Sequence, residues 1–238
     1  MNKIYFVTGS QDLYGEETLA QAAKDSAKMA DFLNEKLSDI AEVVFQPVVK
    51  TADEAEDICV RASSDRECIG VIMWMHTFSP AKMWIRALKA LKKPMLHLHT
   101  QFNEKLPYDS IDMDFMNLNQ SAHGDREFGF ICTRLGIKRE VVAGYYQHED
   151  VIEKIRRFAH AASAVSFSRT LRVAMLGNNM RDVAVTDGDR VESEIRFGWN
   201  VNYYGIGDVV EIADSVTESE IDAKMAEYTE KYTMATDN

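Results

Sequence analysis

Short apolar runs alternate along the whole chain with longer segments of helical periodicity. The first five runs cover residues 4–7, 43–49, 68–75, 94–98 and 141–145. Each is four to eight residues long and bounded by polar or turn-forming residues, which is typical of buried strands. Strands separated by helices form βαβ units with right-handed crossovers and a parallel sheet. The pattern therefore predicts an α/β fold of three layers, doubly wound and flavodoxin-like or Rossmann-like.

Several residues mark where the predicted elements begin and end. Pro47 favours an edge position for the second strand, because proline cannot donate to a sheet ladder. Thr51 and Glu54 form a capping box before the next helix. Ser79 is expected to cap a helix that has Pro80 at its first position. A long loop is expected from the fourth strand to about Leu118, and the first long helix is expected from about Thr18.

A domain boundary is predicted near residue 168. Residues 1–168 would form a substrate-lining α/β domain, and residues 169–238 the start of a second α/β domain. The second part offers one clear strand at 171–176, a weaker one near 201–205, and a capping box from Thr217 to Glu220. So few elements do not cover their own apolar faces, so we expect this second domain to be incomplete.

The charge and composition of the chain argue against several classes of binding partner and cellular location. The chain has 238 residues and a formal net charge of −11, which argues against nucleic acid and anionic membranes as partners. The apolar run after Lys3 is too short for a signal peptide or a membrane span. The three cysteines match no zinc spacing, and we expect them to be small buried side chains in a reducing cytosol.

Neutral polar and aromatic residues follow the predicted strands at their carboxyl ends. In an open parallel sheet this edge is where ligands bind. The loops there are 10–15, 76–79, 99–103 and 117–123, and they hold amides, hydroxyls, imidazoles and aromatic rings without a cluster of Lys or Arg. A polyol needs many neutral hydrogen-bond partners and flat apolar surfaces. A sugar is therefore a better candidate ligand than a phosphate, although the same residues could simply cap helices.

Rival sites are less well supported. Thr8-Gly9-Ser10 is similar to a flavin-phosphate loop, but Glu16 and Glu17 would repel an anion there. His97 and His99 face the same side of a strand and suit a metal ion, yet no third or fourth ligand is evident near them in sequence. Asp112 and Asp114 lie in a loop. We expect no metal site and no catalytic triad within this chain.

Five longer runs resemble the L-arabinose isomerase family from end to end. They are residues 9–15, 76–85, 99–103, 109–124 and 179–189. The resemblance implies reversible isomerisation of L-arabinose to L-ribulose, and of D-galactose to D-tagatose, by a cytoplasmic, manganese-dependent homohexamer. It also implies that the catalytic glutamates and the metal-binding histidines lie outside this chain, which should be inactive alone. Asn178 departs from the family, which usually has aspartate there.

The resemblance also implies a set of substrate-binding residues that line the neighbouring subunit's site. These seven predicted wall residues are Gln11, Leu13, Tyr14, Phe78, Gln120, His123 and Met180. The loop analysis alone selects all of them except Leu13 and Met180, which the apolar pattern would assign to a core. Three alternatives stay open: a related L-fucose-type isomerase, a non-catalytic sugar-binding module, and a flavodoxin-like electron carrier.

Overall fold

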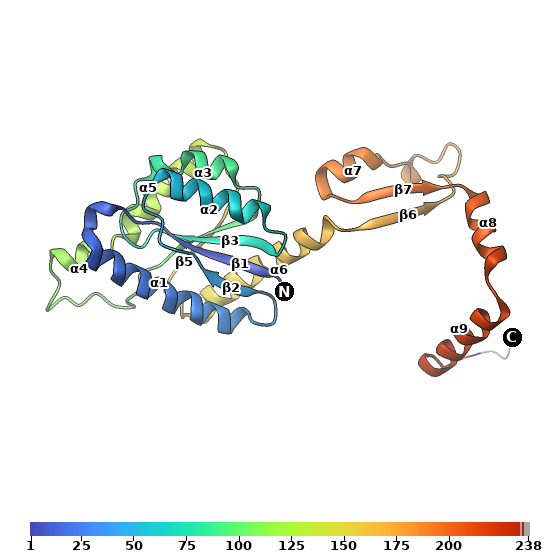
Figure 1. Cartoon of the computed structure of the whole chain (residues 1–238), viewed down its shortest axis with the longest axis horizontal. Coiled ribbons are helices and arrows are strands. Elements are labelled where there is room, and N and C mark those ends of the chain that lie inside the picture. Colours follow the sequence, from blue (N-terminus) through green and yellow to red (C-terminus); the bar gives the residue numbers. More distant parts are fainter. Residues whose placement is uncertain (234, 236–238) are drawn as a thin grey trace. The chain divides into compact units, whose positions relative to one another are not determined.

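The computed structural model describes residues 1–233 and 235, and they divide into two compact units, Met1–Ser166 and Phe167–Asn238. Figure 1 shows the elements of both units. The first unit contains a five-stranded parallel sheet in the order β2-β1-β3-β4-β5. Its strands are β1 (Lys3–Thr8), β2 (Glu42–Phe45), β3 (Cys68–Trp74), β4 (Met95–His99) and β5 (Glu140–Ala143). This order is the flavodoxin-like one, so the predicted fold class is confirmed.

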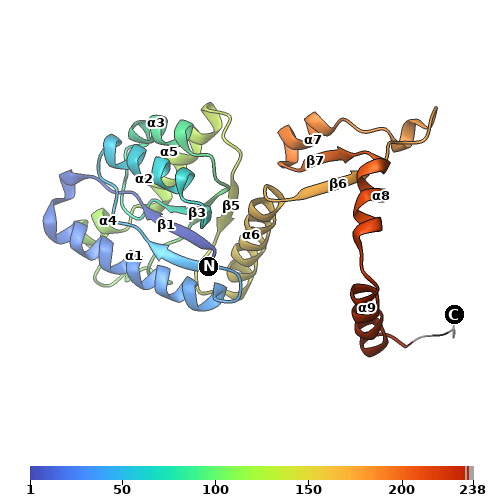
Figure 2. The ribbon, with the colours of Figure 1, turned by 45° about the vertical axis from the view of Figure 1, so that its right-hand side comes forward.

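The helices of this unit lie on both faces of the sheet (Figure 2). They are η1 (Asp12–Tyr14), α1 (Gly15–Leu37), α2 (Ala52–Ser64), η2 (Ala81–Met83), α3 (Trp84–Ala90), α4 (Met113–Leu118), α5 (Ser121–Arg134) and α6 (Glu149–Ser168). Because side chains alternate along a strand, Ile4 and Phe6 pack in one core with α1 and α6. Tyr5 and Val7 pack on the opposite face, in a core with α2, α3 and α5.

Local signals explain several boundaries. The Thr51 hydroxyl accepts from the Glu54 amide, and the Glu54 carboxylate accepts from the Thr51 amide, so the predicted capping box is confirmed. The strand expected over 43–49 ends at Phe45, so Pro47 lies after β2 and not in it, but β2 does lie at the edge of the sheet as predicted. The three cysteines are buried, also as predicted, and burial raises the pKa of the Cys59 thiol to about 12.

Three expectations were wrong in detail. Helix α1 begins at Gly15, because η1 leads directly into it through a glycine with φ +80°. The long loop contains α4, whose amino end is capped by the Asp112 carboxylate accepting from the Phe115 amide at 2.8 Å. Ser79 is not a helix cap: its hydroxyl accepts from the Trp84 indole at 2.9 Å, and the chain enters α3 through the η2 turn instead.

The second unit contains a parallel pair of strands, β6 (Arg172–Leu176) and β7 (Asn200–Tyr204). Its helices are η3 (Ala184–Thr186), α7 (Arg190–Phe197), α8 (Ile206–Ser215) and α9 (Glu218–Lys231), and the capping box of α9 at Thr217 is confirmed. Within 167–233 and at 235, no residue is buried. Apolar side chains such as Ile195 and Ile212 are about 70% exposed, at 72% and 68%. These segments therefore enclose no hydrophobic core of their own.

No helix in the described part of the chain is both long enough and apolar enough to cross a membrane.

Candidate sugar-binding wall and adjoining cavity

The loops after β1 and β3 are tied together at the carboxyl edge of the sheet. The hydroxyls of Ser10 and Thr77 lie 2.6 Å apart and are buried. The carbonyl oxygen of His76 accepts from the Gln120 amide at 3.1 Å and from the Ser121 hydroxyl at 3.3 Å. The start of α5 is thereby fixed against the loop that follows β3.

Four of the seven predicted wall residues form two direct pairs in this region. The Gln120 side-chain amide donates to the Tyr14 hydroxyl at 3.3 Å. The rings of Phe78 and His123 lie 5.1 Å apart between centroids, at 42°. The first pair joins segments that are far apart in sequence, since Gln120 and Tyr14 differ by 106 positions.

The remaining three predicted wall residues make no such pair. Gln11 is half-buried and directly precedes the η1 turn. Leu13, within that turn, is 85% exposed, and Met180, in the second unit, is 70% exposed. The apolar pattern alone would place both in a core, which is wrong here, because Leu13 lies in an exposed turn and none of the described residues of the second unit covers Met180.

His76 does not belong to the solvent-facing surface that its loop predicted. Its ring is fully buried and stacks on Trp74 with centroids 4.2 Å apart and planes at 10°. Its Nε2 lies 3.4 Å from a carboxylate oxygen of Asp25 on α1. Because the ring is held by the core, His76 contributes to the wall through its backbone carbonyl, which anchors α5.

A cavity of about 560 Å³ opens at the ends of β4 and β5, beside the start of α5. Its lining residues are His99, Thr100, Gln101, Asn103, Glu104, Leu106, Ser121, Ala122, Asp125, Arg126, Gly144 and Tyr145. None of the seven predicted wall residues, all of which the structure describes, lines it. The start of α5 takes part in both regions: Gln120 and His123 pair with Tyr14 and Phe78, while the cavity is lined by Ser121, Ala122, Asp125 and Arg126.

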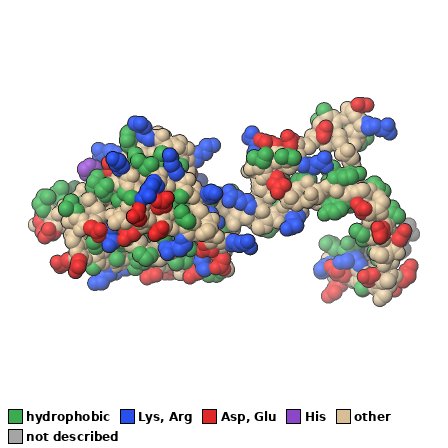
Figure 3. Space-filling model, turned by 45° about the horizontal axis from the view of Figure 1, so that its top comes forward, with side chains coloured by type: hydrophobic (Ala, Val, Ile, Leu, Met, Phe, Trp, Pro, Cys, Tyr) green, Lys and Arg blue, Asp and Glu red, His purple; other side chains and the backbone are tan. Residues whose placement is uncertain are grey.

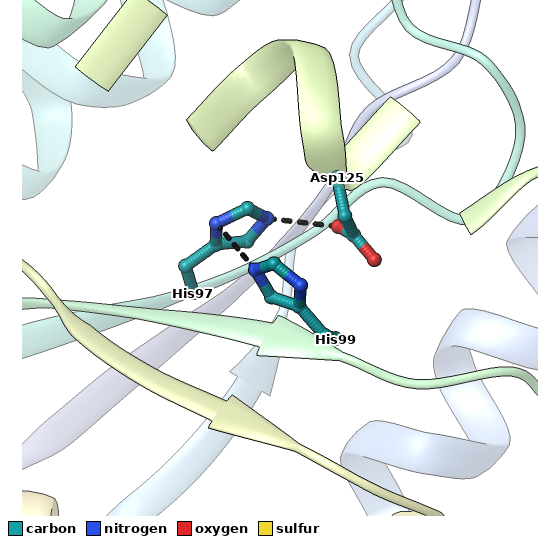
Figure 4. Close-up of side chains that lie close together, drawn as sticks. All are labelled: His97, His99 and Asp125. Atoms are coloured by element: carbon teal, nitrogen blue, oxygen red, sulfur yellow. Dashed lines mark hydrogen bonds and ion pairs between the residues drawn. The ribbon is translucent and has the colours of Figure 1, made fainter. Parts of the chain in front are cut away.

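Three titratable side chains form a chain of hydrogen bonds at this cavity (Figure 4). Nε2 of His97 lies 2.8 Å from an Asp125 carboxyl oxygen, and Nδ1 of His97 lies 3.0 Å from Nε2 of His99. The prediction that His97 and His99 face the same side is confirmed. Burial raises the pKa of Asp125 to about 8 and lowers the pKa of His97 to about 2, since both charged forms lose hydration.

Asp125 is the residue that sequence reasoning missed. The signal was present in α5, where Ser121, Asp125, Phe128 and Cys132 follow the spacing of one helix face and are all buried. A carboxylate on a buried face needs a partner, which indicates a built polar cluster. Its partner could not be identified from spacing, because His97 lies on a strand 28 positions earlier.

The comparisons with known proteins agree with the resemblance. Residues 1–170 match the family model of the L-arabinose isomerase N-terminal domain, and residues 172–238 match that of the L-arabinose isomerase central domain. The chain belongs to the L-arabinose isomerase family.

Curated relatives in this L-arabinose isomerase family are similar over nearly the whole chain. The chain is 52% identical over 230 residues to the L-arabinose isomerase of Geobacillus stearothermophilus, covering 97% of this chain and 46% of that protein. The identity to the L-arabinose isomerase of Thermotoga petrophila is 47% over 235 residues, covering 99% and 47%. The chain therefore spans about half the length of the curated relatives it matches.

The four paired residues of the predicted wall are uncharged polar or aromatic side chains, apart from the His123 imidazole. Amide, phenol and imidazole groups supply donors and acceptors, and the Phe78 ring supplies an apolar surface. On the face of the first unit that Figure 3 shows, basic and acidic side chains are interspersed. The neutral wall, like the net charge of −11, favours an uncharged ligand over a polyanion.

Proposed function

We propose that this chain supplies the substrate-binding wall of an L-arabinose isomerase. The complete protein would interconvert L-arabinose and L-ribulose, and also D-galactose and D-tagatose. The observation that carries the proposal is the pairing of Tyr14 with Gln120 and of Phe78 with His123, in a chain that belongs to this family. The other wall residues, Gln11, Leu13 and Met180, would complete the surface.

The residues of the wall would bind and orient the sugar. Gln120 can donate to or accept from a sugar hydroxyl while its partner Tyr14 holds it in place. Phe78 offers a ring against which the C–H groups of a sugar pack, and His123 offers a ring nitrogen beside it. Holding the sugar in one orientation lowers the entropic part of the barrier for a reaction performed by groups elsewhere.

The reacting groups would come from outside these residues. In the complete protein Mn²⁺ would polarise the carbonyl and hydroxyl oxygens at C1 and C2, and carboxylates would move the hydroxyl protons. A cytoplasmic homohexamer in which the wall faces a neighbouring subunit's site would bring the two parts together. The exposure of Leu13 at 85% and Met180 at 70% supports this, because apolar side chains offered at a surface fit a site completed by other chain segments.

A joined protein tests the proposal. The chain would be fused to the remaining C-terminal part of the Geobacillus stearothermophilus relative, at the position where the 230 matched residues end. With Mn²⁺ the fusion should form L-ribulose from L-arabinose, and the chain of 238 residues alone should form none. Turnover by the chain alone, or a folded fusion that binds Mn²⁺ but leaves both L-arabinose and D-galactose unchanged, would refute the proposal.

Variants of the fusion separate binding from folding. His123→Asn and Phe78→Leu should lower kcat/KM for L-arabinose at least about tenfold, which corresponds to about 1.4 kcal/mol of lost interaction. The matched control is His148→Asn, an exposed histidine whose partner is Glu104 at 3.3 Å. The control should retain the parental kcat/KM, and equal losses in all three variants would count against a specific wall.

A further inference from the structure

Three side chains with metal-binding atoms converge in the first unit, on the side of α5 that lines the cavity. His97 and His99 come from β4 and Asp125 from α5, and one ligand atom from each lies within 4.8 Å of the others. His97 is fully buried, Asp125 is 2% exposed, and His99 is half-buried at the cavity wall. Two imidazoles and a carboxylate form a common ligand set for divalent transition metals.

Two atoms of this cluster are uncommitted. The second carboxyl oxygen of Asp125, Oδ2, is buried without a hydrogen-bond partner among the described residues. The hydrogen bond to His97 uses Nε2 of His99, so Nδ1 remains for another interaction. Figure 4 shows both uncommitted atoms turned to the same side of the cluster. A buried carboxyl oxygen without a partner is costly, and a cation there would satisfy it.

We propose that His97, His99 and Asp125 form a binding site for one divalent ion of the Zn²⁺ or Co²⁺ class. Ligands bound about 2.0–2.2 Å from one ion lie at most about 4.4 Å apart, so the ligand atoms must move closer together. Both ring nitrogens of His97 are in hydrogen bonds, so His97 would exchange one of these bonds for the ion. The cavity of about 560 Å³ gives the ion a path and leaves positions open for water or a small oxygen ligand.

The charged side chains around the cluster are of both signs, so the ligand atoms and not the net charge would decide which ion binds. Glu104 lines the same cavity and would add negative charge, whereas Arg126 also lines it and Arg139 acts electrostatically on both imidazoles. The net electrostatic attraction that these side chains exert on any cation at the cluster is therefore weak. Mg²⁺ and Ca²⁺ prefer all-oxygen sites and should bind poorly, while Zn²⁺ and Co²⁺ gain the nitrogen ligands.

Cobalt is the probe, because its visible d–d absorption reports on its ligands. The metal-free chain of 238 residues would be titrated with Co²⁺ and, by calorimetry, with Zn²⁺. We expect one Zn²⁺ per chain and a Co²⁺ spectrum unlike that of the hydrated ion. His99→Gln and Asp125→Asn should each weaken binding at least about tenfold, since each removes a ligand. His160→Gln, which replaces an exposed histidine on α6, should bind as the parent does.

The outcomes decide the proposal either way. Because His99 is only half-buried, His99→Gln is expected to fold, and circular dichroism would check this. If Asp125→Asn does not fold, the test rests on His99→Gln and on the shift of the parent's unfolding temperature by Zn²⁺, which that variant should lose. A Co²⁺ spectrum of the hydrated ion, or Zn²⁺ binding that is unchanged in folded His99→Gln, would overturn the site.

Discussion

The packing of α5 against the loop after β3 leads to a sharp prediction at Gly124. A methyl group at this position would lie 2.9 Å from the Thr77 carbonyl oxygen and 3.1 Å from the Met75 Cβ. Backbone and Cβ atoms cannot move aside as the end of a flexible side chain can. Helix α5 would therefore have to shift away from Met75 and Thr77. Overpacking of this kind costs about 1–3 kcal/mol. Replacing glycine by alanine within a helix returns about 1 kcal/mol.

Gly129 in the same helix is the matched control. A methyl group there would meet only the end of the Arg139 side chain, at 3.1 Å, which can swing aside. Gly129→Ala should therefore retain most of the stabilisation that alanine gives a helix over glycine. The free energy of unfolding of Gly124→Ala should be lower than that of Gly129→Ala by about 1–3 kcal/mol. Because Gly124 lies directly between His123 and Asp125 in the sequence, the first substitution should also disturb the predicted wall and the cavity.

The assay is urea unfolding followed by tryptophan fluorescence. Trp74 and Trp84 report on the first unit, and Trp199 in the second unit would be replaced by phenylalanine in both variants. The free energies of unfolding should differ by the stated amount at equal m-values. Equal stabilities of the two variants would refute the close packing of α5 on Met75 and Thr77.

Three further predictions concern the first unit. Thr51→Ala should lower the free energy of unfolding by about 1 kcal/mol in urea titrations, because the capping box of α2 is lost. The thiols of Cys59, Cys68 and Cys132 are buried, so they should react with a thiol reagent only after denaturant is added, and rapid reaction of the native chain would contradict this. Burial, followed by the hydrogen bond to Asp65, raises the pKa of Tyr5 to about 12 from its ordinary 10.0. The stability contributed by this protonated hydroxyl should persist below pH 10.0 and be lost as pH rises to about 12, and pH-dependent unfolding of Tyr5→Phe should lack that loss.

The elements that sequence predicted well are those with strong local signals. The five strands of the first unit fall on short, mostly apolar runs, and the caps at Thr51 and Thr217 depend on residues three positions apart. The edge position of β2 agrees with the prediction, but Pro47 is not its cause, since this proline lies two residues beyond the end of the strand. Such features depend on spacing along the chain, and spacing is what a sequence displays directly.

The errors concern side-chain contacts that the spacing of residues along the chain does not reveal. Ser79 had the local pattern of a helix cap, but its hydroxyl accepts a hydrogen bond from the Trp84 indole, and the helix starts later. His76 had the position of a binding residue, yet Trp74 and Asp25 enclose its ring. Leu13 and Met180 were apolar enough for a core, but a side chain is buried only where another element covers it.

The wall was predictable as a set of loops, but its pairs were not. The carboxyl edge of a parallel sheet selects the loops that hold Tyr14, Phe78 and Gln120 without any knowledge of contacts. Which of them touch depends on the exact start of α5, which the His76 carbonyl fixes. The boundary proposed near residue 168 rests on a similar local signal, the change from a helical pattern to an apolar strand.

The most direct test is a crystal structure of the fused protein with L-arabitol, a polyol that resembles L-arabinose but has no carbonyl group to isomerise. We predict that the bound polyol contacts Phe78, Gln120 and His123, with the Gln120–Tyr14 hydrogen bond of 3.3 Å retained behind it. A polyol bound in the cavity beside His99, or at a place that none of these residues reaches, would contradict the proposal that this surface is the sugar-binding wall.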